Sequence, residues 1–406
     1  MRVLYLNPSG QLGGAEVCLL NMVASLRAAQ PEWQLHLIAS DDGPLVLKAT
    51  ELGVHTTVLS FNARLARLGD AGAGGPAGDA VSRSTLLRRL LAALPSIISY
   101  KRRLKRVIRK ISPDVIHTNG FKMHVLGALS QQQGTPVIWH IHDYVQSRPV
   151  MARLLKRLAK RCAIAITNSK SVAEDVRAVC GDRLTLRTLY NGIDLNTFSP
   201  DGPELDLDAL SGLPPAAPGT IRVGLLATLA RWKGHATFLR AMALVPENLP
   251  VRGYITTGQL YRTDGSQSSQ MEIEKLIETL SLSRRIGLTG FVDRPASAMR
   301  ALDVVVHAST EPEPFGLVIA EGMACGKAVI TSHAGGAIEL VEEKINALTH
   351  QPGDAKALAR AIVALTTDAG LRARLGAAGR LTAEQRFDRT RLATELIPIY
   401  RSVIKR

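Results

Sequence analysis

Short apolar runs alternate with longer stretches of helical periodicity along the whole chain. Nearly continuous apolar runs are typical of parallel strands buried on both faces, and their alternation with helices is typical of an α/β fold. The first run is followed by a helical pattern over residues 15–29. Strands of this first series are expected at residues 1–7, 33–40, 114–119, 136–142 and 163–169.

A second series of strands begins after a proline-rich segment that can continue neither a helix nor a central strand. The pattern therefore predicts two doubly wound, Rossmann-like domains, at 1–198 and 199–385, and a helix over 386–406 that can cross back to the first domain. The strands of the second series are expected at residues 221–230, 251–258, 286–292, 303–309 and 328–332.

Composition narrows the class of protein. With 406 residues, 46% hydrophobic and 21% charged, the chain is long enough for two cores and unlike a disordered chain. Its four cysteines form no C-x-x-C, which argues against a zinc site or a disulfide framework. No apolar run approaches eighteen residues, so we expect neither a signal peptide nor a membrane-spanning helix and place the protein in the cytoplasm.

The net charge of +15 is concentrated in the first half of the chain. Residues 1–200 carry 26 Lys and Arg against 13 Asp and Glu, and the rest carries 24 against 22, which gives +13 and +2. A Gly- and Ala-rich segment at 69–84 predicts a mobile loop. The segment 83–110 has ten basic residues and no acid, and its pattern predicts a basic amphipathic helix with a break near Pro95. A second basic cluster covers 148–161.

The candidate chemistry is densest at residues 311–326, EPEPFGLVIAEGMACG. The prolines keep the chain extended until a helix begins near Gly316, and the free N–H groups of its first turn form a receptor for phosphate. Glu313 lies just before this terminus and Glu321 lies further inside. Carboxylates accept hydrogen bonds from sugar hydroxyls, so the pair suits a nucleotide sugar. The alternative is a capping Glu followed by a surface Glu.

Three further positions follow expected strands, where ligands of parallel sheets bind. Arg231 and Lys233 come after the first strand of the second domain and could neutralise a diphosphate, or be solvated charges. Gly13 and Gly14 come after the first strand of the chain and would let the backbone approach a phosphate closely, or form a plain tight turn. Among the strand-end histidines, His142 lies nearest the carboxyl end of its strand and is the catalytic candidate, with a structural role as the alternative.

The only Asp-x-Asp motif in the chain consists of Asp206 and Asp208. Both lie in the proline-rich linker rather than at a strand end. We therefore interpret them as solvated linker charges and expect no metal site.

Taken together, these motifs resemble those of a known family. GGAE after the first strand, NGID before the linker, WKG after the next strand and E-P-F-G-x-x-x-x-E-G-M-A-C-G followed by AGG are similar to those of the retaining glycosyltransferases of family four. The resemblance covers nearly the whole chain and implies the GT-B fold, in which two Rossmann-like domains face a cleft. It also implies that the usual Arg five residues before the WKG lysine is replaced here by Thr228.

The resemblance implies roles for individual residues. Glu321 would bind the donor ribose, Glu313 the transferred sugar, Lys233 the diphosphate, and His142 would lie beside the sugar hydroxyls. Arg231 would then supply the charge that Thr228 lacks. Backbone contacts to sugar and diphosphate would come from Phe315, Gly316, Leu317 and Val318.

The expected activity is sugar transfer from a nucleoside-diphosphate sugar, UDP-sugar first, to a hydroxyl of a lipid-linked or cell-surface glycan precursor, without metal or other cofactor. A sugar-nucleotide epimerase of the same fold and a non-catalytic sugar-nucleotide-binding subunit are the alternatives. The excess positive charge of the first half would then attach the protein peripherally to the anionic inner face of the cell membrane. A solvated basic face is the alternative. Nucleic acid is disfavoured as a partner because aromatic residues make up 4% of the chain and only Tyr100 interrupts the main basic cluster.

Overall fold

The chain divides into two compact units in the computed structural model, which describes residues 1–66, 83–132, 134–257 and 269–404. Unit 1 comprises Met1–Gly192 together with Arg389–Arg406, and unit 2 comprises Ile193–Asp388. Most of the Gly- and Ala-rich segment predicted to be a mobile loop, 69–84, lies outside the described residues.

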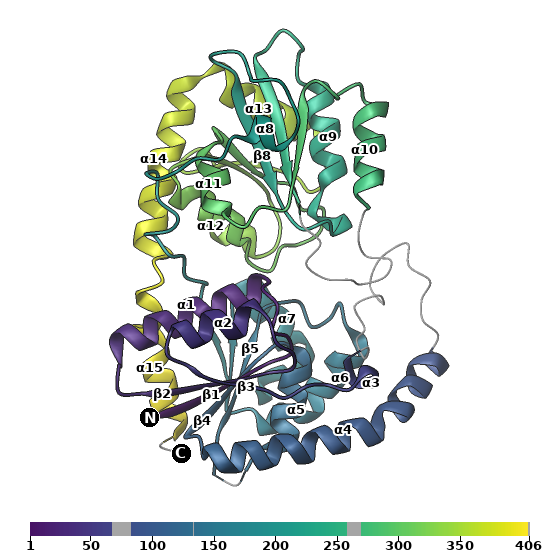
Figure 1. Ribbon diagram of the computed structural model, residues 1–406, viewed down its shortest axis with the longest axis vertical. Coiled ribbons are helices and arrows are strands. Elements are labelled where there is room, and N and C mark those ends of the chain that lie inside the picture. The colour runs from purple at the N-terminus through teal and green to yellow at the C-terminus, as the bar shows by residue number, and fades with distance from the viewer. Residues whose placement is uncertain (67–82, 133, 258–268, 405–406) are drawn as a thin grey trace. The chain divides into compact units, whose positions relative to one another are not determined.

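A seven-stranded parallel sheet forms the centre of unit 1, in the order β3-β2-β1-β4-β5-β6-β7 (Figure 1). β1 pairs with β2 on one side and with β4 on the other, so the strand order reverses between β1 and β4. Loops on the two sides of such a reversal diverge and leave room for a ligand at the carboxyl ends of the strands. The strands are β1 (Arg2–Asn7), β2 (Gln34–Ala39), β3 (His55–Val58), β4 (Val115–Asn119), β5 (Val137–Ile141), β6 (Ile164–Thr167) and β7 (Leu186–Thr188).

Helices cover both faces of this sheet. Apolar side chains of α1, α2 and α15 form one core layer, which includes Met22, Leu45 and Tyr400. Side chains of α4 to α7 form the other, which includes Leu104 and Val172. The helices are α1 (Gly14–Ala29), α2 (Pro44–Glu51), α3 (Ala63–Ala66), α4 (Arg83–Ile111), α5 (Phe121–Ser130), α6 (Pro149–Leu158), α7 (Lys170–Cys180) and α15 (Arg391–Ile404).

The basic amphipathic segment forms a single long helix, α4, with Pro95 inside it. The break expected near Pro95 was therefore wrong. Proline removes one hydrogen bond from a helix, but the residues that follow it are held by burial of Tyr100, Leu104 and Ile108 against the sheet, which offsets that loss.

A six-stranded parallel sheet forms the centre of unit 2, in the order β10-β9-β8-β11-β12-β13, and its order reverses between β8 and β11. The strands are β8 (Ile221–Leu226), β9 (Val251–Thr256), β10 (Ile286–Gly290), β11 (Val304–His307), β12 (Ala328–Ser332) and β13 (Leu348–His350). The helices are α8 (Leu207–Leu210), α9 (His235–Leu244), α10 (Gln270–Thr279), α11 (Pro295–Arg300), α12 (Leu317–Ala324), α13 (Ala355–Thr367) and α14 (Ala369–Arg386).

Of the two linker aspartates, Asp206 is exposed to solvent as the sequence suggested, whereas Asp208 is not. Asp206 caps α8 by accepting from the backbone N–H of Ala209 at 3.0 Å. Asp208 is buried, forms an ion pair with Arg222 at 3.0 Å and accepts from Tyr254 Oη at 2.6 Å. Burial raises the pKa of Asp208, but the hydrogen bonds from Tyr254 and from neighbouring backbone and arginine groups outweigh it and lower the pKa overall. Asp208 therefore anchors the linker to the sheet of unit 2.

The α/β class and the two doubly wound parallel sheets are confirmed. Each sheet has one point where its strand order reverses, and these two points are where functional side chains are expected. Among the described residues, no helix combines the length and the apolar composition needed to span a bilayer.

Candidate functional site

Lys233 and Glu313 meet where the strand order of unit 2 reverses. Lys233 lies in the 3-10 turn Arg231–Lys233 that follows β8, and Glu313 lies in the segment between β11 and α12. Lys233 Nζ donates to Glu313 Oε2 at 2.8 Å and lies 3.9 Å from the centre of the Trp232 ring. Glu313 is 6% exposed, so the ammonium and the carboxylate form a largely buried ion pair.

Gly234 explains why a glycine follows Lys233. It has a φ of 77°, and a Cβ atom there would lie 1.8 Å from the carbonyl oxygen of Ala308. The loop after β8 therefore packs directly on the loop after β11. A hydrogen bond of 2.7 Å from the N–H of Thr310 to the carbonyl of Trp232 joins the same two loops. This close packing brings Lys233 to Glu313.

Glu313 is held by more than its lysine. His307 Nε2 and Ser309 Oγ each lie 2.9 Å from Glu313 Oε2, and the N–H of Gly336 donates to the Glu313 carbonyl at 2.6 Å. Burial raises the pKa of Glu313, but the charge of Lys233 and the hydrogen bond with His307 outweigh it and hold the pKa below its ordinary value. Glu313 is thus ionised near neutral pH.

The first turn of α12 begins at Leu317, four residues after Glu313. Its N-cap, Gly316, has a φ of 94°, a conformation that favours glycine. The N–H groups of Leu317 and Val318 lie in the first turn, where the helix itself supplies no carbonyl partner, so they are available to an anion. Phe315 is buried edge-on against Phe387, with the ring centres 6.0 Å apart, and this contact fixes the start of the helix.

Glu321 lies one turn further along α12 and is partly buried. No group among the described residues forms a hydrogen bond with its carboxylate, and burial raises the pKa of Glu321 to about 7. A carboxylate without a protein partner can accept hydrogen bonds from the hydroxyls of a ligand.

Arg231 is not brought to the pair. Its guanidinium bonds Glu272 on α10 at 3.0 Å, and both side chains are more than half exposed. The Lys233–Glu313 pair has no net charge of its own, because the ammonium and the carboxylate neutralise each other. The N–H groups at the start of α12 therefore add to what this site offers an anion.

In unit 1, Gly13 is the N-cap of α1 and Gly14 is its first residue. The Gly13 N–H donates to Glu16 Oε2 at 3.1 Å, so the Glu16 carboxylate holds the N-cap residue at the start of the helix. Both glycines lie in the loop that follows β1, beside the reversal of the strand order.

His142 follows β5, and its Nε2 lies 2.6 Å from Asn119 Oδ1 at the end of β4. Burial lowers the pKa of His142 to about 4, so its imidazole is neutral near pH 7. The ring packs 4.1 Å from that of His140, which is fully buried. His117, also fully buried, bonds Tyr400 Oη at 2.8 Å and is structural.

Sequence reasoning missed four polar residues at these two sites: Asn7, Glu16, Asn119 and Ser309. It also treated His307 as only a strand-end histidine. A signal was present for two of them, because Asn7 and Asn119 are polar residues at the ends of buried apolar strands. The pairing of β1 with β4, which places them side by side, is not visible in the sequence.

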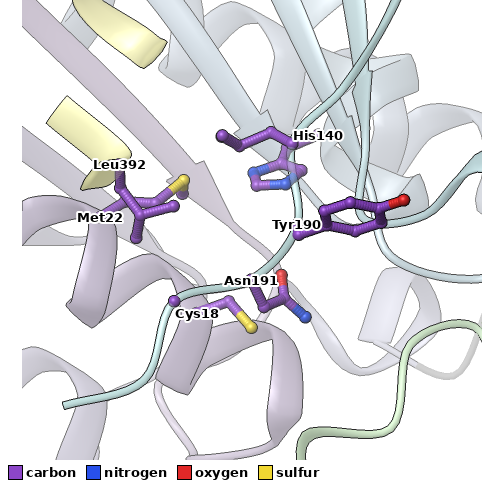
Figure 2. Close-up of a pocket in the computed structure, with 8 residues that line it drawn as sticks. Cys18, Met22, His140, Tyr190, Asn191 and Leu392 are labelled. Carbon is purple, nitrogen blue, oxygen red and sulfur yellow. The ribbon is translucent and has the colours of Figure 1, made fainter. Parts of the chain in front are cut away.

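A small pocket in unit 1 lies beside the buried His140 (Figure 2). It is lined by Cys18, Met22, His140, Asn191 and others, and neither ring nitrogen of His140 has a hydrogen-bond partner among the described residues. It has almost no space that even a water-sized molecule can enter, so it is too small for a nucleotide sugar.

No group of three or more His, Cys, Asp or Glu side chains within residues 1–66, 83–132, 134–257 and 269–404 is arranged to hold a metal ion.

Two sequence-family models match the chain. The model described as "Glycosyltransferase Family 4" matches residues 12–197, and the model described as "Glycosyl transferases group 1" matches residues 216–382. Between them they span most of both units.

The chain is also similar to individual glycosyltransferases. D-inositol 3-phosphate glycosyltransferase of Xylanimonas cellulosilytica is 32% identical over 59% of this chain and 57% of its own length. Lipopolysaccharide core biosynthesis glycosyltransferase LpsE of Rhizobium meliloti is 28% identical over 55% of this chain and 60% of its own. The chain thus spans less than two thirds of these two curated relatives.

Similarity over the full length comes from a crystal structure. HepE of Anabaena in complex with UDP-glucose is 26% identical, with a TM-score of 0.79, over 99% of this chain and 100% of that one. The family resemblance and the GT-B fold expected from the sequence are confirmed. The chain belongs to the glycosyltransferases of family 4, the group 1 glycosyl transferases.

Proposed function

We propose that this protein transfers a sugar from a UDP-sugar to an acceptor hydroxyl with retention at the anomeric carbon. The observation that carries the proposal is the buried Lys233–Glu313 pair beside the N-terminus of α12, at the reversal of strand order in unit 2. The similarity to HepE, whose structure contains UDP-glucose, supports this donor class.

In unit 2 we assign the diphosphate to Lys233 and to the backbone N–H groups of Phe315 to Val318, which lead into the first turn of α12. Lys233 has three N–H donors, of which Glu313 takes one, so the ammonium can bond a phosphate as well. Glu321 binds the ribose hydroxyls, and Glu313 contacts the transferred sugar. To reach the diphosphate, Arg231 must break its ion pair with Glu272. Because both side chains of that pair are exposed, breaking it costs little free energy.

In unit 1 we assign His142 to a hydroxyl of the transferred sugar and the loop at Gly13 and Gly14 to the sugar or phosphate. The neutral imidazole of His142 suits a hydrogen bond to a hydroxyl rather than an ion pair with a phosphate.

In the proposed reaction, the acceptor oxygen forms a bond to the anomeric carbon on the face from which the diphosphate departs. The bond from that carbon to the diphosphate oxygen breaks, and the acceptor proton passes to a phosphate oxygen of the leaving UDP. No carboxylate acts as a covalent nucleophile. Lys233 and the α12 N-terminus stabilise the charge that develops on the diphosphate.

The acceptor we propose is a lipid-linked or cell-surface glycan precursor reached at an anionic membrane surface. The relative LpsE is named for lipopolysaccharide core biosynthesis. In unit 1, α4 exposes Arg102, Arg106 and Arg109, and none of them forms an ion pair within the described residues. Exposed basic side chains without acidic partners are complementary to anionic lipid.

Donor binding and transfer are tested in two steps. A thermal-shift screen of UDP, GDP and ADP with their sugars should show stabilisation by UDP and a UDP-sugar, since a ligand that binds the folded state raises its Tm. Incubation of that UDP-sugar with membrane lipid extract should then give a glycosylated product with the donor's anomeric configuration.

Glu313→Gln and His142→Ala should each lower the rate of transfer, whereas the matched control Glu311→Gln, at an exposed position two residues away, should not. Unchanged transfer in both site variants would contradict the site assignment. An epimerised sugar nucleotide formed without acceptor would identify an epimerase. Donor binding without any transfer would identify a binding subunit.

A further inference from the structure

Four polar side chains in unit 1 form a continuous hydrogen-bonded chain that ends on His142. Asn7 Nδ2 donates to Glu16 Oε1 at 3.1 Å, and Asn119 Nδ2 donates to Asn7 Oδ1 at 2.7 Å. Asn119 Oδ1 in turn lies 2.6 Å from His142 Nε2. Glu16, Asn7 and Asn119 are all buried, so water does not compete for these bonds. The chain crosses the reversal of strand order between β1 and β4.

The direction of each bond follows from the groups at its ends. The Asn7 amide nitrogen faces two acceptors, the carboxylate of Glu16 and the Ser9 carbonyl at 2.6 Å. The Asn119 amide nitrogen likewise faces Asn7 Oδ1 and the Ala15 carbonyl at 3.4 Å. A backbone carbonyl can only accept, so neither amide can be turned round without placing two acceptors against each other.

His142 is therefore left with an acceptor in front of its Nε2. A neutral imidazole has one N–H and one unprotonated nitrogen, and the N–H must be on Nε2 to satisfy Asn119 Oδ1. The other nitrogen, Nδ1, forms no hydrogen bond with any described residue. It is available as an acceptor.

We propose that Glu16, acting through Asn7 and Asn119, is a positioning residue that fixes His142 in the tautomer with its proton on Nε2. Nδ1 is then the nitrogen that meets a hydroxyl donor. This inference rests on the proposed function only for what the hydroxyl belongs to, which is the transferred sugar. Since Glu16 also accepts from the N–H of Gly13, one carboxylate orients both the glycine loop and His142.

The tautomer is measured directly by NMR on the full chain labelled with ¹⁵N-histidine, without substrate and above pH 7. Protonated and unprotonated ring nitrogens have well-separated ¹⁵N shifts, and His142→Gln assigns the signal by its loss. We expect the wild-type proton on Nε2. Glu16→Gln removes one of the two acceptors that orient the Asn7 amide and leaves only the Ser9 carbonyl, so the ordered direction is weakened and part of the proton population should move to Nδ1.

The matched control is Glu174→Gln, which removes the same charge from an exposed position of α7 in the same unit and should leave the tautomer unchanged. Asn7→Leu removes the next residue of the hydrogen-bonded chain and should shift the His142 proton toward Nδ1, as Glu16→Gln does. A wild-type proton on Nδ1, or a tautomer that neither variant changes, would overturn the inference. If one variant fails to fold, the wild-type measurement still decides which tautomer is present and the other variant tests the positioning role.

Activity gives the second readout. Glu16→Gln should lower kcat for sugar transfer by about ten- to a hundredfold, the range typical of residues that orient a functional histidine, with KM for the donor changed less than about twofold. A tautomer change without loss of kcat would support the positioning role of Glu16 but contradict the role of His142 in the proposed function. The two failures are thus distinguishable.

Discussion

Glu321 has a carboxyl group whose charge changes near neutral pH. Burial raises its pKa to about 7, and the ionised form is the better acceptor for two ribose hydroxyls. We therefore predict that affinity for a UDP-sugar increases as pH rises through about 7. Isothermal titration calorimetry below and above that pH checks it. Glu321→Gln should bind more weakly than the wild type above pH 7 and lose most of the pH dependence; a wild-type affinity that is flat with pH would contradict the ribose assignment.

The same pKa has a consequence for stability, with the opposite sign. Because the folded pKa of Glu321 lies above that of the unfolded chain, the folded state is disfavoured as pH rises from about 4.5 to about 7. The buried position of Glu321 therefore lowers the stability of unit 2 in this pH range. A residue that destabilises its own fold and has no protein partner is a reasonable place to expect a ligand.

Lys233 and Glu313 should show strong energetic coupling. Lys233→Met leaves a buried carboxylate without its main counter-charge, which should lower the free energy of unfolding of unit 2 by about 3 kcal/mol. Adding Glu313→Gln should restore much of that loss, with a coupling energy of about 1–3 kcal/mol. Hydrogen exchange of β8 and β11 amides reads the stability of unit 2 separately from unit 1. Additive effects of the two substitutions would contradict the coupling.

The sequence identified the residues of this pair but not their contact. Lys233 and Glu313 each belong to a recognisable motif, whereas His307 and Ser309 become partners of Glu313 only when β11 is placed beside β8. Asp208 was misread for a related reason. A proline-rich composition indicated a loop, and nothing in it showed that Arg222, Arg252 and Tyr254 from β8 and β9 would enclose that carboxylate.

At the scale of elements, α4 presents a testable surface. Tyr100, Leu104 and Ile108 face the sheet, and Arg102, Arg106 and Arg109 are exposed. We predict that replacing these three arginines by Gln weakens binding to anionic liposomes by about a hundredfold, since each basic residue near such a surface contributes about 1 kcal/mol. Co-sedimentation at low salt measures it.

The matched control for α4 removes three exposed arginines elsewhere in unit 1: Arg177, Arg183 and Arg187. Their replacement should reduce liposome binding much less. Equal losses in the two variants would indicate that net charge alone matters, and an unchanged bound fraction in the α4 variant would exclude the membrane surface.

Elements were predictable from sequence where burial is complete. β1, β4, β5, β11 and β12 are buried along nearly their whole length, and each was expected within a residue or two of its observed bounds. The strands that were missed are β3, β7 and β13. β3 reads HTTV and is largely exposed, and the other two are three residues long. Such strands form because a neighbouring strand offers hydrogen bonds, which their own side chains do not reveal.

At the scale of the molecule, the two units should respond differently to acid. Burial lowers the pKa of His117 to about 3 and of His142 to about 4, and holds those of His124 and His140 well below the ordinary value, all in unit 1. The unfolded chain takes up these protons near pH 6.5, so stability is fully present above that pH and is lost as pH falls below it. Each group can contribute up to about 1.4 kcal/mol per pH unit.

Unit 2 has fewer such groups. His235, with a pKa lowered to about 4, and His350 act in the same direction there, whereas the raised pKa of Glu321 acts against them. The lowered pKa values of Asp208 and Glu313 remove stability only below about pH 4.5. We predict that hydrogen exchange of β1 and β4 amides, corrected for intrinsic rates, shows a larger loss of protection between pH 7 and about pH 5.5 than that of β8 and β11. His140→Phe should reduce the loss; equal losses in the two units would contradict the prediction.

Unit 2 is inserted as one continuous segment into unit 1, whose helix α15 follows it in the chain. On the ribosome, the sheet of unit 1 is therefore made first but waits for α15 until all of Ile193–Asp388 has emerged. Until then, the apolar side chains that pack on Leu392, Leu396 and Tyr400, among them Tyr5 and Trp33, lack their cover. Unit 2 has no such dependence, so the later-synthesised unit can complete its core before the earlier one.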